Sequence, residues 1–327
     1  MPGDEKLRRR HHIVPRFHLK RFADERGMLT RVELPGVKRH PISINDATVE
    51  KDFYLVEEED GRQRDEVEKL LGMVEEPAAT AMRQLLDGSM WPITPEAREA
   101  IATWAAFQYL RTPTRRQMGN ELADSIMKMQ IGMGGKARIR AALRERDGRE
   151  PTDAEADEAW AEYTDFDSYR VEPHRNHHIK TMLDILPLAV PMFYDRGWAL
   201  FQFRRRALVT SDNPVVLVPA DDHPPFLGVG LGNAGAILVP LDRRVALLMI
   251  GKGTPDGIVP GTTTMANDFN IRVAGNAHRA AFHHPGDDPF AAITLPQRRD
   301  RITNADEQLK KFFPQGVFPL ADDEPAF

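Results

Sequence analysis

Short polar motifs at distant points of the sequence carry the side chains best suited to acid–base and anion chemistry. H-H-I-V-P occupies residues 11–15, Q-Y-L-R-T-P residues 108–113 and T-S-D-N-P residues 210–214. An ordinary apolar core does not select such residues, because each buried polar group needs a partner. We therefore expect the motifs to converge on one pocket, with the candidate catalytic residues His12, Gln108, Arg111 and Asp212.

His12 stands just before a predicted short helix, and Pro15 suits the first turn of that helix. The free N–H groups and the dipole at a helix start disfavour a charged imidazole. A neutral ring can act as a general base or as a metal ligand. H-H-I-V-P also resembles the first half of an HNH-type nuclease motif, although the second half is not evident in the sequence. The alternative is a histidine that only hydrogen-bonds a loop.

Gln108 and Arg111 continue the apolar face of a predicted helix. Residues 101, 104, 108 and 111 are spaced by 3, 4 and 3, so the polar pair lies on the stripe that Ile101 and Trp104 bury. A buried guanidinium without a partner is very costly. We expect Arg111 either to clamp an anion in a pocket or to pair structurally with a carboxylate such as Asp212.

Asp212 lies between two β-like runs, in a segment whose Asp-Asn-Pro sequence favours a turn. A carboxylate at a strand end is a common position for a base or a metal ligand. In the expected pocket, Asp212 orients His12 or binds a divalent cation with it, so the candidate metal ligands are His12 and Asp212. Arg111 clamps the anion, and Gln108 positions the attacking water.

These roles predict a hydrolase of a phosphate-bearing substrate, such as a phosphodiesterase or nuclease, whose cofactor, if it has one, is a divalent metal. The expected partners are a small anionic substrate or nucleic acid, in line with the basic runs at residues 7–10 and 204–206. The net charge of −5 argues against a large nucleic-acid footprint. The alternative is a non-catalytic ligand-binding or interaction module, in which the same polar set is a buried structural network. The sequence leaves open whether the protein is an enzyme.

Two further motifs are interpreted as structural. G-L-G-N-A-G (residues 230–235) matches the dinucleotide fingerprint, but a strand-like run follows it where the fingerprint requires a helix. We therefore expect a flexible loop and no nicotinamide or flavin binding. His174 and His178 have the spacing of two zinc ligands on a helix, but the Glu of H-E-x-x-H is missing. We expect a solvated or packed helix start there.

Composition excludes several classes of protein. The chain of 327 residues is 41% hydrophobic and 28% charged, which is ordinary for a protein with a buried core. It has no cysteine, which excludes disulfides, thiolate zinc sites, iron–sulfur clusters and a cysteine nucleophile. The start shows no signal-peptide pattern, and no apolar run reaches the length of a membrane span. We expect a cytoplasmic protein with no membrane partner, and the oligomeric state stays open.

The elements that must position these motifs fall into three zones. Residues 11–55 are expected to contain a short helix and strands near 28–34 and 52–56. The second zone, residues 65–191, is predicted to be helical: a helix over 67–85 kinked or split at Pro77, a second from residue 95, oppositely charged segments at 136–149 and 150–167, and a third over 174–186 ended by Pro187 and Pro191. In the third zone, residues 197–250 have the pattern of short strands, and a helix is expected over 262–282.

The predicted fold class is α+β, with a helical layer packed on a mostly antiparallel mixed sheet in a single unit. We expect one domain over residues 11–280, a basic N-terminal tail over 1–10 and a C-terminal extension over 285–327.

With these pieces assembled, the chain resembles domain-of-unknown-function family 4238. The resemblance rests on H-x-V-P followed by F-H-L-K-R-F (12–22), on E-K-D-F-Y (50–54), on Q-x-x-R-T-P (108–113) and on T-S-D-N-P-V (210–215). Lys51 departs from the usual residue of the second motif. The order and spacing agree over about residues 11–280. The resemblance implies no reaction, but it implies that six residues are family features: His12, Gln108, Arg111, Ser211, Asp212 and Asn213.

Overall fold

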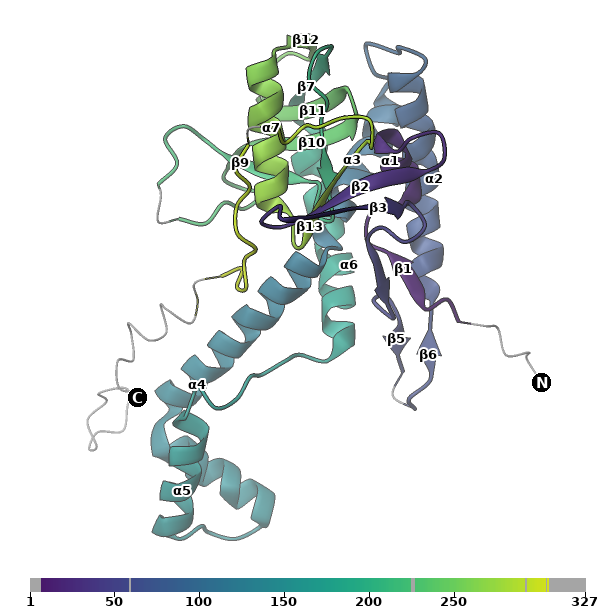
Figure 1. Ribbon diagram of the computed structural model, residues 1–327. Coiled ribbons are helices and arrows are strands. Elements are labelled where there is room, and N and C mark those ends of the chain that lie inside the picture. Colours follow the sequence, from purple (N-terminus) through teal and green to yellow (C-terminus); the bar gives the residue numbers. More distant parts are fainter. Residues whose placement is uncertain (1–6, 59, 225–226, 292, 304, 306–327) are drawn as a thin grey trace, which may run out of the picture. The chain divides into compact units, whose positions relative to one another are not determined.

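The computed structural model describes residues 7–58, 60–224, 227–291, 293–303 and 305 (Figure 1). By its internal contacts the chain forms two compact units. Unit 1 comprises residues 1–115 and 175–299, and unit 2 comprises residues 116–174 and 300–327. The α+β class is confirmed, and the helical layer and the sheet both belong to unit 1. The boundaries of the expected domain, tail and extension stay predictions.

The N-terminal part of unit 1 is built from short elements. They are β1 (Arg10–His12), α1 (Arg16–Leu19), the 3₁₀ helix η1 (Lys20–Phe22), β2 (Met28–Glu33), β3 (Lys38–Ser43), β4 (Val49–Lys51), β5 (Val56–Glu57) and β6 (Gln63–Arg64). β1 pairs with β4, β2 with β3 and β5 with β6, all antiparallel. The strand predicted over 52–56 is wrong, because Asp52 has a positive φ of 55° and the chain leaves the extended conformation there.

The main sheet has five strands in the order β12-β7-β11-β10-β9. Their bounds are β7 (Arg196–Phe203), β9 (Val216–Pro219), β10 (Ala234–Asp242), β11 (Val245–Lys252) and β12 (Gly257–Gly261). Neighbouring strands run antiparallel except β12, which runs parallel to β7. The mostly antiparallel mixed sheet is thus confirmed. G-L-G-N-A-G leads into β10, so no helix start follows this loop to hold a pyrophosphate.

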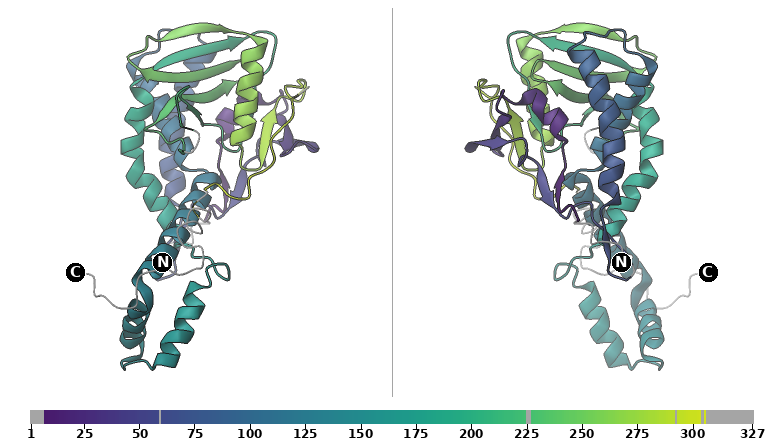
Figure 2. Two further views of the ribbon diagram at one scale, coloured as in Figure 1. Left: turned by 90° about the vertical axis from the view of Figure 1, so that its left-hand side faces the viewer. Right: turned by 90° about the vertical axis from the view of Figure 1, so that its right-hand side faces the viewer.

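Helices cover both faces of this sheet. They are α2 (Glu66–Leu86), α3 (Pro95–Leu110), α6 (Arg175–Tyr194) and α7 (Thr263–Asn276). Trp198 and Leu200 of β7 pack in the core with α2, α3 and α6, whereas Ala199 and Phe201 pack in the core that includes α7. This alternation follows from the two-residue period of a strand. In Figure 2, α7 lies in front of the sheet in the left view and α2 lies in front of it in the right view.

Three helical prolines do not end their helices. α2 continues through Pro77, and α6 continues through Pro187 and Pro191 to Tyr194. The predicted end of the third helix at Pro187 is therefore wrong. All three prolines are exposed, so water can bind the carbonyl groups that lose their helical partner.

The helix predicted over residues 262–282 is two elements. α7 begins after the N-cap Thr262, whose side chain accepts a hydrogen bond from the backbone N–H of Met265, and it ends at Asn276. Ala280–His283 form β13, which lies between β2 and β8 (Thr210–Ser211) in a second sheet of order β3-β2-β13-β8. Ala280 is therefore part of a strand and does not extend the apolar face of the helix.

Unit 2 contains most of α4 (Pro113–Asp147) and all of α5 (Asp153–Thr164). α4 is two helical stretches joined at Gly135, whose φ of 62° is outside the helical region. The oppositely charged segments pair as expected. Lys136 and Asp157 are 2.9 Å apart, and Arg140 forms an ion pair with Asp153.

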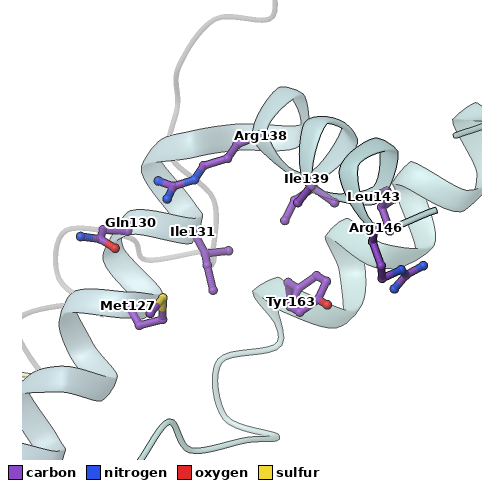
Figure 3. A pocket seen from close by; sticks show the side chains of 9 residues that line it. Met127, Gln130, Ile131, Arg138, Ile139, Leu143, Arg146 and Tyr163 are labelled. Carbon is purple, nitrogen blue, oxygen red and sulfur yellow. The ribbon is translucent and has the colours of Figure 1, made fainter. Parts of the chain in front are cut away.

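A largely apolar cavity of about 250 Å³ lies within unit 2 (Figure 3). Met127 and Ile131 line it from the first stretch of α4, Ile139 and Leu143 from the second, and Tyr163 from α5. It contains none of the motif residues.

Candidate functional site

Arg111 lies directly after α3 and is almost fully buried, with 1% of its side chain exposed. Its Nε and Nη2 both donate to Oε1 of Gln108, over 3.0 and 2.7 Å. Its Nη1 donates to Oε1 of Glu75 over 2.7 Å. Each of the three guanidinium nitrogens therefore has a partner inside the protein. The sequence predicted a carboxylate such as Asp212 as the structural partner of Arg111. In the structure the carboxylate that binds Arg111 is that of Glu75.

Gln108 joins α3 to the N-terminal motif. Its side chain is buried, and Nε2 donates to the backbone carbonyl of Ile13 over 3.1 Å. Tyr54, from the E-K-D-F-Y motif, donates its hydroxyl hydrogen to the backbone carbonyl of Arg111 over 3.3 Å. The structure thus brings three of the sequence motifs together around the end of α3.

His11 is fully buried, and both of its ring nitrogens have partners. Nδ1 accepts a hydrogen bond from the backbone N–H of Tyr54 over 2.9 Å, so Nε2 carries the proton and donates to the carbonyl of Arg8 over 2.7 Å. Burial lowers the pKa of His11, which favours this neutral form. Its roles in the structure are to hold the N-terminal strand and the E-K-D-F-Y segment together.

His12 differs from its neighbour because its Nε2 is buried without a hydrogen-bond partner among the described residues. Burial lowers the pKa of His12, and the charge of Arg16 lowers it further. Hydrogen bonding of the ring to the backbone of Ile44 and Asn45 acts to raise this pKa, and the charge of Glu75 does so more weakly.

Two acidic residues of α2, Glu68 and Glu75, complete this arrangement and were not predicted. Burial raises the pKa of Glu68, and the charge of Glu75 raises it further. Glu68 Oε1 lies 3.9 Å from Nε2 of His11. The signal for both residues is their spacing of seven, which places them on one helix face with Leu71 between them.

Asp212 has a different environment. Its carboxylate accepts three backbone hydrogen bonds, from the N–H groups of His278, Arg279 and Ala280, at 2.7, 2.8 and 3.1 Å. These groups form the connection between α7 and β13. Burial raises the pKa of Asp212, while the three N–H donors act to lower it. Both carboxylate oxygens are used in holding this connection.

The neighbours of Asp212 act on the same connection. The side-chain amide of Asn213 donates to the carbonyl of Asn276 over 2.9 Å, and that of Asn276 donates to the carbonyl of Asn213 over 2.7 Å. Ser211 Oγ accepts from the backbone N–H of Asn213 over 3.1 Å. T-S-D-N-P-V thus functions as a clamp on the end of α7.

One residue links this clamp to the N-terminal motif. Nε2 of the buried His18, in α1, lies 3.0 Å from Oγ1 of Thr210. The ring of His18 also packs against Trp104 of α3, with 5.2 Å between the ring centroids. Burial lowers the pKa of His18 to about 3, so the ring is neutral. The N-terminal motif therefore contacts the T-S-D-N-P-V segment through His18 and Thr210. The carboxylate of Asp212 instead binds backbone N–H groups of the connection after α7.

Metal binding by His12 and Asp212 receives no support from this geometry. Across the described ranges, no three His, Asp or Glu side chains are grouped in a way that could hold a metal ion. The histidines near the start of α6 include His178, whose ring packs edge-on against Phe53 at 5.8 Å, as expected for a packed helix start.

The fold and the site together define an α+β protein in which short motifs fasten an N-terminal segment and a helix end to a common core. The chain belongs to the DUF4238 family of proteins of unknown function, whose family model matches residues 10–287. No curated protein and no solved structure matches the chain. Within the described part of the chain, no helix is long and apolar enough to cross a membrane.

Proposed function

We propose that this protein is a non-catalytic binding module, in which the motif residues form a buried structural network. One observation carries the proposal: the Arg111 guanidinium is 1% exposed and is bound by Gln108 and Glu75. An arginine that clamps a substrate presents free N–H groups to a cavity. Arg111 instead donates its hydrogen bonds to side chains of the protein itself.

Binding a phosphate at Arg111 would require the Glu75 ion pair to break. A buried charge that loses its partner costs several kcal/mol, which the incoming anion would have to offset. Asp212 faces the same difficulty, because a role as base or ligand would remove the acceptor of three backbone N–H groups. Both residues therefore suit a structural role better than a catalytic one.

The experiment that tests this proposal compares stability and turnover in the same variants. Arg111→Lys and Asp212→Asn are assayed for urea unfolding and for hydrolysis of bis(p-nitrophenyl) phosphate and a labelled oligonucleotide, with added Mg²⁺ or Mn²⁺. The expected result is loss of stability in both variants and no turnover by the parent protein. Turnover by the parent that Arg111→Lys abolishes without a change in stability would overturn the proposal.

A second candidate function, a phosphodiester hydrolase that uses His12 as its base, is favoured by the free Nε2 of this neutral ring. The base would then be His12 with Glu75 as the carboxylate whose charge acts on it, and not His12 with Asp212. Two results together would establish this function: the parent protein hydrolyses the substrate, and His12→Ala loses this activity while its unfolding midpoint stays unchanged. Equal behaviour of the parent and His12→Ala in the assay would exclude it.

A further inference from the structure

Cationic side chains from four segments of unit 1 gather on one surface. The segments are η1, the end of α2, the loop between β7 and β8, and the turn between β10 and β11. We call this the arginine surface, and its members are Lys20, Arg21, Arg83, Arg204, Arg205, Arg206, Arg243 and Arg244. Three backbone hydrogen bonds join three of these segments: Arg243 N–H to the carbonyl of Arg21 (3.3 Å), Leu208 N–H to that of Arg243 (2.9 Å) and Phe203 N–H to that of Arg244 (2.8 Å). The end of α2 is joined to η1 by the hydrogen bonds from Arg21 to Asp87.

Only part of this positive charge is neutralised inside the protein. Arg21 forms two hydrogen bonds with Asp87, Arg243 forms two with Asp287, and Nη2 of Arg244 lies 3.8 Å from Oδ1 of the same Asp287. Arg206 donates to the neutral oxygens of Asn267 and Ala291. No carboxylate of the described residues lies within ion-pair distance of the exposed Lys20, Arg204 and Arg205. A chain with a net charge of −5 therefore concentrates unpaired cations at one place.

A cavity of about 370 Å³ opens within the arginine surface. Lys20, Arg21 and Arg83 line it together with Asp87, which accepts two hydrogen bonds from Arg21, and with the apolar side chains of Phe17 and Met82. The volume falls in the range of small-ligand pockets. The Phe17 ring packs against Trp104 at 5.8 Å, which holds it in place.

Asp242 also lines this cavity. Its carboxylate accepts the backbone N–H of Arg244 over 2.9 Å, and burial raises its pKa. A nucleotide has a flat base, amino groups on that base and phosphates. The apolar and aromatic side chains suit the face of the base, the carboxyl group suits an amino group, and the surrounding cations suit the phosphates.

We propose that the arginine surface binds single-stranded nucleic acid, with phosphates on the arginines and one unpaired base in the cavity. This inference extends the proposed function, which requires a binding surface without saying where it lies. Seven of the eight cations are arginines, whose planar guanidinium groups bind phosphate oxygens in pairs. A single strand is favoured over a duplex because a base must be unpaired and unstacked to enter a cavity, and a single strand does not pay the cost of breaking a base pair.

Fluorescence anisotropy with a labelled 12-nucleotide single strand and the full chain tests the proposal. We expect binding that weakens as salt rises from 50 to 200 mM, and a loss of at least about tenfold in affinity for Arg204→Glu/Arg205→Glu. The matched control, Lys180→Glu/Lys252→Glu, makes the same change of charge at exposed positions outside this surface and is expected to bind within about twofold of the parent. Equal loss in both double variants, or no binding by the parent, would overturn the proposal.

A second variant tests the cavity. Ala79 also lines it, and Ala79→Trp fills it without a change of charge. This variant is expected to bind the single strand more weakly and inorganic polyphosphate as well as the parent does. Equal binding of the single strand by Ala79→Trp and the parent, with both folded by urea unfolding, would show a general polyanion surface and contradict the assignment to a base.

The outcomes separate this inference from the proposed function. Binding followed by cleavage of the strand, with cleavage lost in His12→Ala, would contradict the proposed function and support the inference. Absence of binding, with the stability changes of Arg111→Lys as expected, would overturn the inference and support the proposed function.

Discussion

Arg111 and Glu75 form an ion pair whose cation is buried and whose anion is partly exposed: 1% of the arginine side chain and 27% of the glutamate side chain are accessible to solvent. The pair joins the end of α3 to the middle of α2 over 2.7 Å. Water reaches the carboxylate but not the guanidinium, so Arg111 depends on its protein partners for compensation of its charge.

Replacement of Arg111 by Lys tests this dependence. A lysine keeps the charge but cannot bind Gln108 and Glu75 at once, and we expect the free energy of unfolding to fall by about 3 kcal/mol. Urea unfolding followed by tryptophan fluorescence measures the change. Arg144→Lys, at an exposed position of α4, is the control and is expected to change stability by less than about 0.5 kcal/mol. Equal stability of the two variants would mean that Arg111 is not part of a closed network.

The adjacent histidines His11 and His12 provide a matched comparison. His11→Ala removes two hydrogen bonds and a buried ring, and we expect a loss of about 3 kcal/mol in the free energy of unfolding. His12→Ala removes a ring whose Nε2 has no partner in the described structure, and we expect a loss below about 1 kcal/mol. Thermal and urea unfolding of the two variants give the comparison, and a reversed order would contradict the assigned roles.

The sequence predicted the burial of Gln108 and Arg111 but did not identify Glu75 as the carboxylate that binds Arg111. The 3-4-3 spacing from Ile101 to Arg111 placed Gln108 and Arg111 on a buried stripe and required compensation of the charge. Spacing along one helix cannot identify which neighbouring helix packs against it. It therefore does not single out Glu75, among the 49 acidic residues of the chain, as the partner of Arg111. The acids Glu68 and Glu75 on the face of Leu71 were the available signal.

The backbone partners of Asp212 were hidden from the sequence for a related reason. The helical spacing of Phe269 and Val273, which the following alanines extend, predicts one helix over residues 262–282. That interpretation hid the turn at residues 277–279, and with it the backbone N–H groups that Asp212 binds. The strand β13 depends on pairing with β2 and β8, which are far away in the sequence, and local patterns do not report such pairing.

Asp212→Asn tests the role of the carboxylate. The amide has one acceptor oxygen in place of two, so at least one of the backbone N–H groups of residues 278–280 loses its partner. We expect a loss of about 2 kcal/mol in the free energy of unfolding. Asp222→Asn, at an exposed position, is the control. Hydrogen exchange should also show faster exchange at His278 and Arg279 in Asp212→Asn, and unchanged exchange there would contradict the clamp.

His18 makes stability depend on pH. Its pKa in the folded protein is about 3, because of burial, compared with 6.5 in the unfolded chain. As pH falls below 6.5 the unfolded chain takes up a proton that the folded protein does not, so stability is lost progressively towards pH 3. Once the unfolded histidine is protonated, His18 accounts for about 1.4 kcal/mol per pH unit of this loss.

Urea unfolding from pH 7 to pH 4 measures this dependence. His18→Gln keeps a group that can hydrogen-bond Thr210 but cannot take up the proton, and we expect a shallower slope by about one proton. An NMR titration of the parent should show the His18 ring neutral down to about pH 4. A slope that His18→Gln does not change would contradict the neutral, buried ring.

A double-mutant cycle between Glu75 and Arg111 measures the strength of their buried ion pair without any ligand. Glu75→Ala, Arg111→Met and the double variant are unfolded in urea, and the coupling free energy is the difference between the double change and the sum of the single ones. We expect a coupling of about 2 kcal/mol, because each residue stabilises the fold through its ion pair with the other. A coupling below about 0.3 kcal/mol would show that Arg111 is energetically free of Glu75 and available to a substrate.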